Sequence, residues 1–477
     1  MNLNRKVLLV LAAAGVLPVR PALAQSLCGS EDAKATPASA TTDDGFGTSF
    51  DAALAGFGVV GAPDAGADGA GRAYIYAINP VVPQLQFELS ADDGATGNEF
   101  GQAIAADNAL ALVGAPSESS LGPAAGAAYL FLRSTGAQID KLTASDGRGL
   151  DLFGGAVDID FDRAVVGASD KSSSTGAVYV FEIVGLDAVE RFKLTASDAA
   201  AVDRFGRSLA IDGAGSGAGE VGFALIGAPG NDDFGASSGS AYLFNIETGE
   251  ETAKLLPDDP AAGSQFGFQV ALYIDGGVAL AAVAADTSNP DGSVGSVYLF
   301  DVSDRANPVQ LSKIVASDTP APGDFGTSIS LTADVLVASS ISGTATRSGT
   351  VYSFDITDPA NPVQTAITRA SDSTAFALFG SSLSLYEGPA GLRIFAGAPG
   401  ADSGDPAPGT PVSGAVYALS VDTCRPDFDG DCLLTNFDFL AFQNHFDAGD
   451  LAADFDGDGS LTIFDFLAYQ NAFDAGC

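Results

Sequence analysis

Two acidic segments near the C-terminus carry the residue types and the spacing that a calcium site needs. Residues 427–446 (DFDGDCLLTNFDFLAFQNHF) and residues 454–473 (DFDGDGSLTIFDFLAYQNAF) align at an offset of 27 residues. In each segment, acids stand at positions 1, 3, 5 and 12. Calcium takes about six to eight hard oxygen ligands, and a tight loop can supply alternating carboxylates together with one backbone carbonyl. The spacing therefore predicts calcium binding at both loops.

Each loop supplies six candidate ligands, of which the fourth is a backbone carbonyl and the fifth a hydroxyl that acts directly or through water. The first loop offers Asp427, Asp429, Asp431, the carbonyl of Leu433, Thr435 and Asp438. The second loop offers Asp454, Asp456, Asp458, the carbonyl of Ser460, Thr462 and Asp465. We expect two calcium ions here. Without them the segment is expected to be loose, because its carboxylates repel one another and its core is small.

Helical patterns follow both loops. Apolar residues recur at helical spacing as Phe439, Leu440, Phe442 and Phe446 in the first segment, and as Phe466, Leu467, Tyr469 and Phe473 in the second. They are most simply the small core that two helices share. A single acidic loop is equally well explained by a solvated turn, but two matching loops with matching helices favour calcium binding.

The segment resembles the dockerin domain, a duplicated calcium-binding module that docks extracellular enzymes onto cohesin scaffolds. The resemblance covers about residues 425–477. It rests on a helix that follows each EF-hand-type loop without one before it, and on Asp rather than Glu at position 12. It implies a cohesin-like protein partner. The first loop departs from the pattern because Cys432 stands where the second loop has Gly459, so we expect the second site to be the better formed.

On the N-terminal side of these loops, one sequence motif is repeated seven times. Each unit reads as four short strands, which in the second unit cover residues 100–106, 109–113, 126–132 and 139–143. A repeat of this period and composition predicts a mainly β fold, a seven-bladed β-propeller. The units begin at the Phe-Gly pairs of Phe46, Phe100, Phe153, Phe205, Phe266, Phe325 and Phe379.

The repeats resemble the FG-GAP family, which forms the propeller head of integrin α-subunits and occurs in many exported bacterial proteins. The resemblance covers about residues 36–420. Gly-Ala-Pro is intact at residues 61–63, 114–116, 227–229 and 397–399, is Gly-Ala-Ser at 167–169, and is lost in units five and six. The connection that carries calcium in integrin-type repeats is short in this chain. We therefore expect no calcium in the blades, and we interpret Asp158, Asp160 and Asp162 as strand residues.

A propeller must be closed into a ring, and the seventh unit ends at Leu419 without a fourth strand. Residues 34–47 resemble residues 141–154, so we expect residues 34–40 to complete the last blade. Closure of this kind removes open sheet edges. The four cysteines allow three disulfide pairings. We favour Cys28 with Cys424 at the seam and Cys432 with Cys477 in the C-terminal module.

The N-terminus has the pattern of a secretory signal peptide. Arg5 and Lys6 precede a short apolar run, and Ala22-Leu23-Ala24 gives a cleavage site before Gln25. We expect residues 1–24 to be removed, residues 25–423 to form the propeller and residues 424–477 the dockerin-like module. No later stretch is apolar enough to span a bilayer, so a secreted, monomeric protein is expected. The net charge of −39 argues against a nucleic-acid partner, because phosphates would be repelled.

The sequence favours binding over catalysis. The only histidine, His445, lies on the expected dockerin-like helix, where we expect it to be exposed, and Ser-His-Asp or Cys-His catalysis needs an imidazole. We therefore expect a non-catalytic binding or adhesion protein without an organic cofactor. Its propeller would bind a glycan or a cell-surface protein, and its calcium-dependent tail would attach it to a partner. The alternative is an extracellular polysaccharide-active enzyme that uses two carboxylates, or a component of an enzyme complex that docks through the C-terminal module.

Overall fold

The computed structural model describes residues 27–37, 44–53, 55–66, 68–79, 82–213, 221–275, 277–285, 294–318, 323–342, 346–372, 374–389, 391–401, 413–423, 436–449, 453, 455 and 460–475. These residues fall into two compact units, one within Ser26–Cys424 and the other within Arg425–Cys477. Each unit is described by itself.

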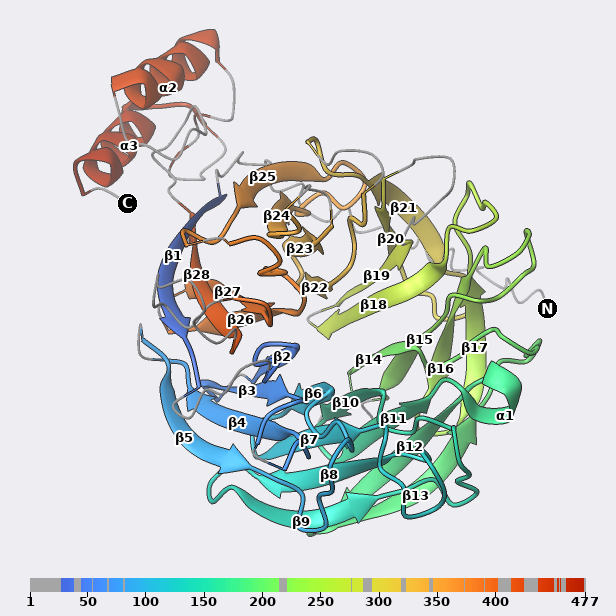
Figure 1. The fold of residues 1–477 in the computed structure, drawn as a ribbon. Helices are drawn as coiled ribbons and strands as arrows, with labels where there is room; N and C mark the ends of the chain where they lie inside the picture. Colours follow the sequence, from blue (N-terminus) through green and yellow to red (C-terminus); the bar gives the residue numbers. More distant parts are fainter. Residues whose placement is uncertain are drawn as a thin grey trace, which may run out of the picture. The chain divides into compact units, whose positions relative to one another are not determined.

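The larger unit consists of seven four-stranded antiparallel sheets, or blades, arranged around a common centre (Figure 1). The prediction of a seven-bladed propeller is confirmed. Blade 1 contains β2 (Ser49–Ala53), β3 (Phe57–Ala62), β4 (Arg72–Ala77) and β5 (Gln84–Leu89). Blade 2 contains β6 (Ala103–Ala106), β7 (Leu110–Ala115), β8 (Ala127–Leu132) and β9 (Ala137–Leu142). Blade 3 contains β10 (Ala156–Asp160), β11 (Arg163–Ala168), β12 (Ala177–Val184) and β13 (Asp187–Leu194), with the short turn α1 (Lys171–Ser174) between β11 and β12.

The remaining blades repeat this order. Blade 4 contains β14 (Ser208–Asp212), β15 (Phe223–Ala228), β16 (Ser240–Asn245) and β17 (Glu250–Leu255). Blade 5 contains β18 (Phe266–Asp275), β19 (Val278–Ala285), β20 (Ser296–Asp301) and β21 (Val309–Ile314). Blade 6 contains β22 (Ile329–Leu331), β23 (Val335–Ser340), β24 (Thr350–Asp355) and β25 (Val363–Thr368). Blade 7 contains β26 (Leu383–Gly388), β27 (Gly391–Ala398), β28 (Ala415–Thr423) and β1 (Leu27–Ala35).

The ring is closed by the first strand of the chain. β1 pairs antiparallel with β28, with Lys34 opposite Tyr417, so blade 7 combines both ends of the propeller. The match of Lys34 to Lys141 is correct, but the expected range 34–40 is wrong. In blade 2 the outer strand β9 ends just after its lysine, and β1 likewise ends one residue after Lys34. Residues 38–40 lie outside the described residues.

The phenylalanine of each Phe-Gly pair fills the space between two blades. Phe205 is fully buried, and its ring meets Tyr242 and Phe244 edge-on at centroid distances of 5.6 and 5.7 Å. Its apolar cluster joins side chains of blade 3, such as Val178, to side chains of blade 4, such as Ile226. Burial of an aromatic side chain is worth several kcal/mol, on the order of 3–5 when it is truncated to Ala. The repeated phenylalanine therefore holds neighbouring blades together.

The glycine of Gly-Ala-Pro allows two blades to approach backbone to backbone. A Cβ on Gly227 would stand 2.0 Å from the carbonyl oxygen of Gly267 in the next blade, which no real side chain tolerates. Blades 5 and 6 have Ala284 and Ser339 at this place. There the Ser339 hydroxyl donates to the Gly380 carbonyl at 2.7 Å. The lost Gly-Ala-Pro signature thus reflects a wider junction within an unchanged fold.

The smaller unit contains two helices, α2 (Asn436–Ala448) and α3 (Ile463–Ala475). Phe442 and Tyr469 stack at its centre with ring centroids 4.0 Å apart. The expectation of a small core shared by the two helices is confirmed for six residues, which are Phe439, Phe442 and Phe446 of α2 and Phe466, Tyr469 and Phe473 of α3. It is wrong for Leu440 and Leu467, which are exposed, because a step of one residue turns a helix by about 100° away from the core face.

Candidate binding face of the propeller

One face of the propeller gathers the connections that could contact a ligand. In each blade the second strand ends, and the next blade's first strand begins, at the same face, because successive strands are antiparallel. Single bridges such as Gly176 with Phe205 and Gly239 with Phe266 tie the two kinds of loop together there. We call this the loop face. It consists of the loops between second and third strands and the loops that lead from one blade to the next.

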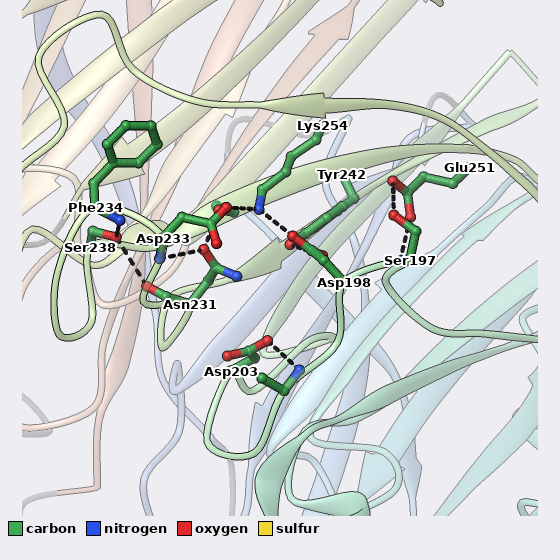
Figure 2. Close-up of polar contacts among 12 residues, drawn as sticks. Ser197, Asp198, Asp203, Asn231, Asp233, Phe234, Ser238, Tyr242, Glu251 and Lys254 are labelled. Carbon is green, nitrogen blue, oxygen red and sulfur yellow. Dashed lines mark hydrogen bonds and ion pairs between the residues drawn. The ribbon is translucent and has the colours of Figure 1, made fainter.

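Polar clasps join neighbouring blades at the loop face. In Figure 2, Lys254 lies between Asp233 and Asp198, and Asp198 also meets Tyr242. Asp198 follows the outer strand of blade 3, whereas Tyr242 and Lys254 belong to blade 4. Tyr242 donates to Asp198 at 2.8 Å, and the Lys254 Nζ lies 2.5 Å from the same carboxylate. The same arrangement recurs as Asp93–Tyr129–Lys141, Asp146–Tyr179–Lys193, Asp259–Tyr298–Lys313 and Asp372–Tyr417–Lys34.

The clasps hold their aspartates ionised. Burial would raise the pKa of Asp198, but the hydrogen bonds from Lys254 and Tyr242 outweigh it and lower the pKa below its usual value. In the tyrosine partner the pKa moves the other way. Burial first, and then the Asp259 carboxylate, raise the pKa of Tyr298 to about 12 against the lowering effect of the Lys313 contact. The network is therefore charged throughout the neutral range and fixes the loops that it joins.

A second set of hydrogen bonds joins the outer strand of one blade to the loop that follows the outer strand of the preceding blade. Ser197 donates its backbone N–H and its hydroxyl to Glu251 of the next blade, at 2.8 and 2.9 Å (Figure 2). At the seam, Glu31 of β1 accepts the N–H of Ser371 at 3.0 Å. Sequence reasoning identifies the recurring Asp and Tyr only as turn and strand residues and misses their role as inter-blade partners. The usable signal is that Asp, Tyr and Lys recur in phase.

The backbone of the loop face is strained. Among the described residues, every non-glycine residue with positive φ except Phe161 lies in its loops. The turn α1 holds three of them in succession, Ser172, Ser173 and Ser174, with φ of 55°, 66° and 61°. A left-handed residue costs roughly 1–2 kcal/mol, and such strain collects at functional sites. The strain thus singles out this face over the opposite one.

Two cavities open on the loop face at blades 2 to 4. The larger has a volume of about 650 Å³ and the smaller about 340 Å³. Both are lined by Leu152 and Asp170, so they adjoin. The larger is further lined by Asp146, residues 148–151 and residues 171–174. The smaller is further lined by Glu99, Gln102, Pro116, Gly155, Ser169, Arg204 and Arg207.

A buried ion pair forms the floor of the larger cavity. The Lys171 Nζ lies 2.7 Å from Asp151 and 3.1 Å from Asp146, and it donates to the Asp146 carbonyl at 3.0 Å. Lys171 and Asp151 are both almost fully buried. In blade 2 the corresponding loop carries Glu118, which pairs with Lys141 at 3.2 Å. The exchange of Glu for Lys gives blade 3 a basic group where blade 2 has an acid.

Acidic side chains also lie along the innermost strands. Asp51 accepts the Ala52 and Ala106 N–H groups, both at 2.9 Å, and so bridges blades 1 and 2. Burial raises the pKa of Asp51 to about 6, against the lowering effect of these hydrogen bonds. Burial and then the Asp51 charge raise the pKa of Asp158 well above its usual range. Asp158 and Asp160 lie on β10, as expected for strand residues, whereas Asp162 lies in the turn that follows this strand.

Only four of the twelve candidate calcium ligands are described. Asp438 and Asp465 are fully buried near the starts of α2 and α3. Asp465 accepts the Thr462 N–H at 2.7 Å, and Thr462 caps α3 by accepting the Phe464 N–H at 3.1 Å. Ser460 is exposed. The other eight, Asp427, Asp429, Asp431, Leu433, Thr435, Asp454, Asp456 and Asp458, lie outside the described residues.

Calcium binding therefore stays a prediction. Across the described ranges, no group of three or more His, Cys, Asp or Glu residues is placed to hold a metal ion. The cysteine pairings likewise fall outside the described side chains. His445 is half-buried on α2 and not fully exposed as expected.

A family model described as FG-GAP repeat matches residues 84–131, 137–181, 189–244 and 250–300. These segments therefore contain FG-GAP repeats, which supports over this part of the chain the resemblance noted from the Phe-Gly and Gly-Ala-Pro motifs. No curated protein matches the chain. Within the part of the chain that the structure describes, no helix is long and apolar enough to cross a bilayer.

Proposed function

We propose that the protein is a secreted, non-catalytic binding or adhesion protein whose loop face recognises the ligand. Loops that a rigid scaffold holds in place commonly carry binding residues, and the FG-GAP propeller is such a scaffold. The observation that carries the proposal is the coincidence, on one face, of strained loops, inter-blade clasps and two adjoining cavities. Loops that are fixed before the ligand arrives lose little entropy on binding.

The C-terminal unit supports attachment to a second protein. Its two helices expose matching apolar residues at the offset of 27 that relates the two loops. These are Phe437 (69% exposed), Leu440 (51%), Phe464 (65%) and Leu467 (46%). Exposed apolar residues in such a cluster mark protein contact sites. We propose that this duplicated face docks a cohesin-like partner when calcium orders the module. The signal-peptide pattern supports export.

The loop face is tested with a glycan array. A Gln102→Trp variant places a large ring in the smaller cavity, and Gln86→Trp on the outer strand β5 is the matched control. Retention by wild type and by Gln86→Trp, together with loss for Gln102→Trp, would support the proposal. Equal retention by all three proteins would place the ligand elsewhere.

The docking proposal is tested with a panel of purified cohesin domains and the full chain. Binding in calcium, loss with a chelator and loss in Phe437→Ser/Phe464→Ser are expected. Phe161→Ser, which alters an exposed phenylalanine of the propeller, should bind as wild type does. Binding that survives both the chelator and the double substitution would contradict the proposal.

A further inference from the structure

Two arginines, Arg204 and Arg207, lie in the wall of the smaller cavity. Within the described part of the chain, Arg204 and Arg207 take part in no ion pair. Most described lysines, by contrast, are paired, as expected in a chain with 60 acids and 21 bases. Other described arginines, such as Arg133 and Arg305, also lie outside ion pairs and stack on phenylalanine rings. Arg204 and Arg207 differ from these in lining one cavity together.

The two guanidinium groups also oppose each other electrostatically. Desolvation by the surrounding walls, followed by the neighbouring Arg204 charge, lowers the pKa of Arg207, and Asp170 offsets this in part. An anion placed between two such groups removes the repulsion and gains charge-assisted hydrogen bonds. Planar guanidinium groups are also suited to bidentate contacts with a carboxylate.

The arginines are held in place by the loops that carry them. Arg204 has φ of 57°, and its N–H donates to the carbonyl of Ser174 in the strained turn α1 at 2.8 Å. The Arg207 guanidinium stacks over the ring of Phe268 in the next blade, 5.5 Å from its centroid. Neighbouring blades thus hold the Arg207 guanidinium and the backbone of Arg204, so part of the site is formed in advance of a ligand.

The other groups that line the cavities favour a sugar as the bearer of the carboxylate. Asp151 is paired with Lys171, Asp146 is paired with both Lys171 and Lys193, and Glu99 accepts the Ser117 hydroxyl at 2.8 Å. Asp170 and Gln102 offer acceptors and donors for hydroxyl groups. The walls of the smaller cavity provide mainly polar groups, which suits a ligand rich in hydroxyl groups better than a peptide with an apolar anchor. An acidic peptide, which an arginine pair can also bind, is distinguished from a sugar by the test below.

We propose that the smaller cavity binds a uronic acid unit of a glycan. Arg204 and Arg207 hold its carboxylate, Asp170 and Gln102 bind ring hydroxyls, and neighbouring sugar units extend into the larger cavity. The inference rests on the proposed ligand-binding role of the loop face and names the chemical class of the ligand. Arg204 and Arg207 balance the two acids of the lining, Glu99 and Asp170, and the acidic groups elsewhere in the chain are screened beyond about 8 Å at physiological salt.

The test measures binding of the full-length protein to oligogalacturonate by calorimetry. The methyl ester of the same oligosaccharide is the neutral control. Hexaglutamate presents carboxylates on a peptide and shows whether the site requires a sugar. We expect at least tenfold weaker binding of the ester. We also expect at least tenfold weaker binding of the acid by Arg204→Gln and by Arg207→Gln, since each change removes a charge-assisted hydrogen bond. Arg191→Gln, on the outer strand β13, should bind as wild type does.

Several outcomes would overturn the inference. These are equal binding of acid and ester, unchanged binding by both arginine variants, no binding of oligogalacturonate at millimolar concentration, and arginine-dependent binding of hexaglutamate that exceeds that of the sugar. Thermal unfolding of each variant shows whether it is folded. If neutral glycans bind the loop face and Gln102→Trp abolishes that binding, the proposed function stands while this inference fails. If no glycan binds at all, both fail.

Discussion

The carbonyl oxygen of Gly47 lies 2.0 Å from the point where a Cβ on Gly397 would stand. Gly397 belongs to the last blade and Gly47 to the first, so this contact closes the ring. It repeats the approach of Gly227 to Gly267 between blades 4 and 5. The last junction is therefore built as the internal ones are, and the Phe-Gly and Gly-Ala-Pro motifs are the two sides of one contact.

The close approach of Gly227 to the next blade predicts that a substitution by Ala at this glycine lowers the stability of the protein. Gly227→Ala would force its Cβ against a backbone carbonyl, and overpacking of this kind costs roughly 1–3 kcal/mol. Urea unfolding should show a lower free energy of unfolding. The matched change Ala284→Gly at the wider junction should cost only about 0.5–1 kcal/mol, from backbone entropy. A neutral Gly227→Ala would show that the blades do not approach as described.

The buried Phe-Gly phenylalanines should be among the most sensitive positions. Phe205→Ala removes a fully buried ring together with its edge-on contacts to Tyr242 and Phe244, and a loss of about 3–5 kcal/mol is expected. Phe234→Ala is the control, because Phe234 is half exposed in a neighbouring loop (Figure 2). Thermal or urea unfolding measures both. Similar small effects at the two positions would contradict the packing.

The seam predicts that β1 is required for a closed monomer. A chain that lacks residues 27–37 exposes the edge of β28, which is expected to cause self-association that light scattering detects. A synthetic peptide of residues 26–37 should restore the monomer. The same peptide with Glu31→Ala and Lys34→Ala should restore it less well, because it cannot contact Ser371 and Asp372. A truncated chain that stays monomeric with an unchanged unfolding midpoint would contradict this closure.

The clasps predict loss of stability in acid. The pKa of Asp198 is lowered in the fold, so its contribution is present above its unfolded pKa of about 3.9 and is lost as the pH falls through the folded value. Asp198→Asn should therefore lower the free energy of unfolding at pH 7, by about 1 kcal/mol for a partly exposed pair. The difference from wild type should shrink towards pH 3. A difference that is constant with pH would exclude the charged clasp.

Asp51 predicts the opposite trend. Its pKa is raised to about 6 by burial, so its ionisation opposes folding above that pH. Compared with an Asp51→Asn variant, the wild type should gain roughly 1–2 kcal/mol of stability as the pH falls from about 8 to about 5, because the folded protein takes up a proton that the unfolded chain does not. Denaturant unfolding at several pH values measures this. Parallel curves for the two proteins would show that Asp51 is not desolvated.

The repeated features could be predicted from the sequence, and the features of single blades could not. Residues equivalent to Phe205 and Gly227 recur at a regular spacing along the chain. This spacing predicts seven blades, because each repeat needs the same residues to pack against the next one. The closing strand is predicted on the wrong side of Lys34, because the match of residues 34–47 covers the end of a strand and the loop after it. Leu440 is wrongly predicted in a core that only the helix geometry could define.

The candidate site could not be predicted, for a different reason. Arg204 and Arg207 face Asp170 and Gln102 across three blades, and no short motif links these residues. Their meeting depends on the left-handed conformations of Ser174 and Arg204, which no composition signal indicates. The twelve candidate calcium ligands differ from the residues of the cavity in this respect. They lie close together in the sequence, so their spacing alone predicts them without any knowledge of the fold.

The central claim is that the loop face binds a glycan without cleaving it. The most direct measurement incubates wild-type protein with acidic and neutral polysaccharides while both retained protein and newly formed reducing ends are followed. The account predicts saturable retention by a polysaccharide and no release of reducing ends over a day. Release of reducing ends, or the absence of retention by every polysaccharide, would contradict it.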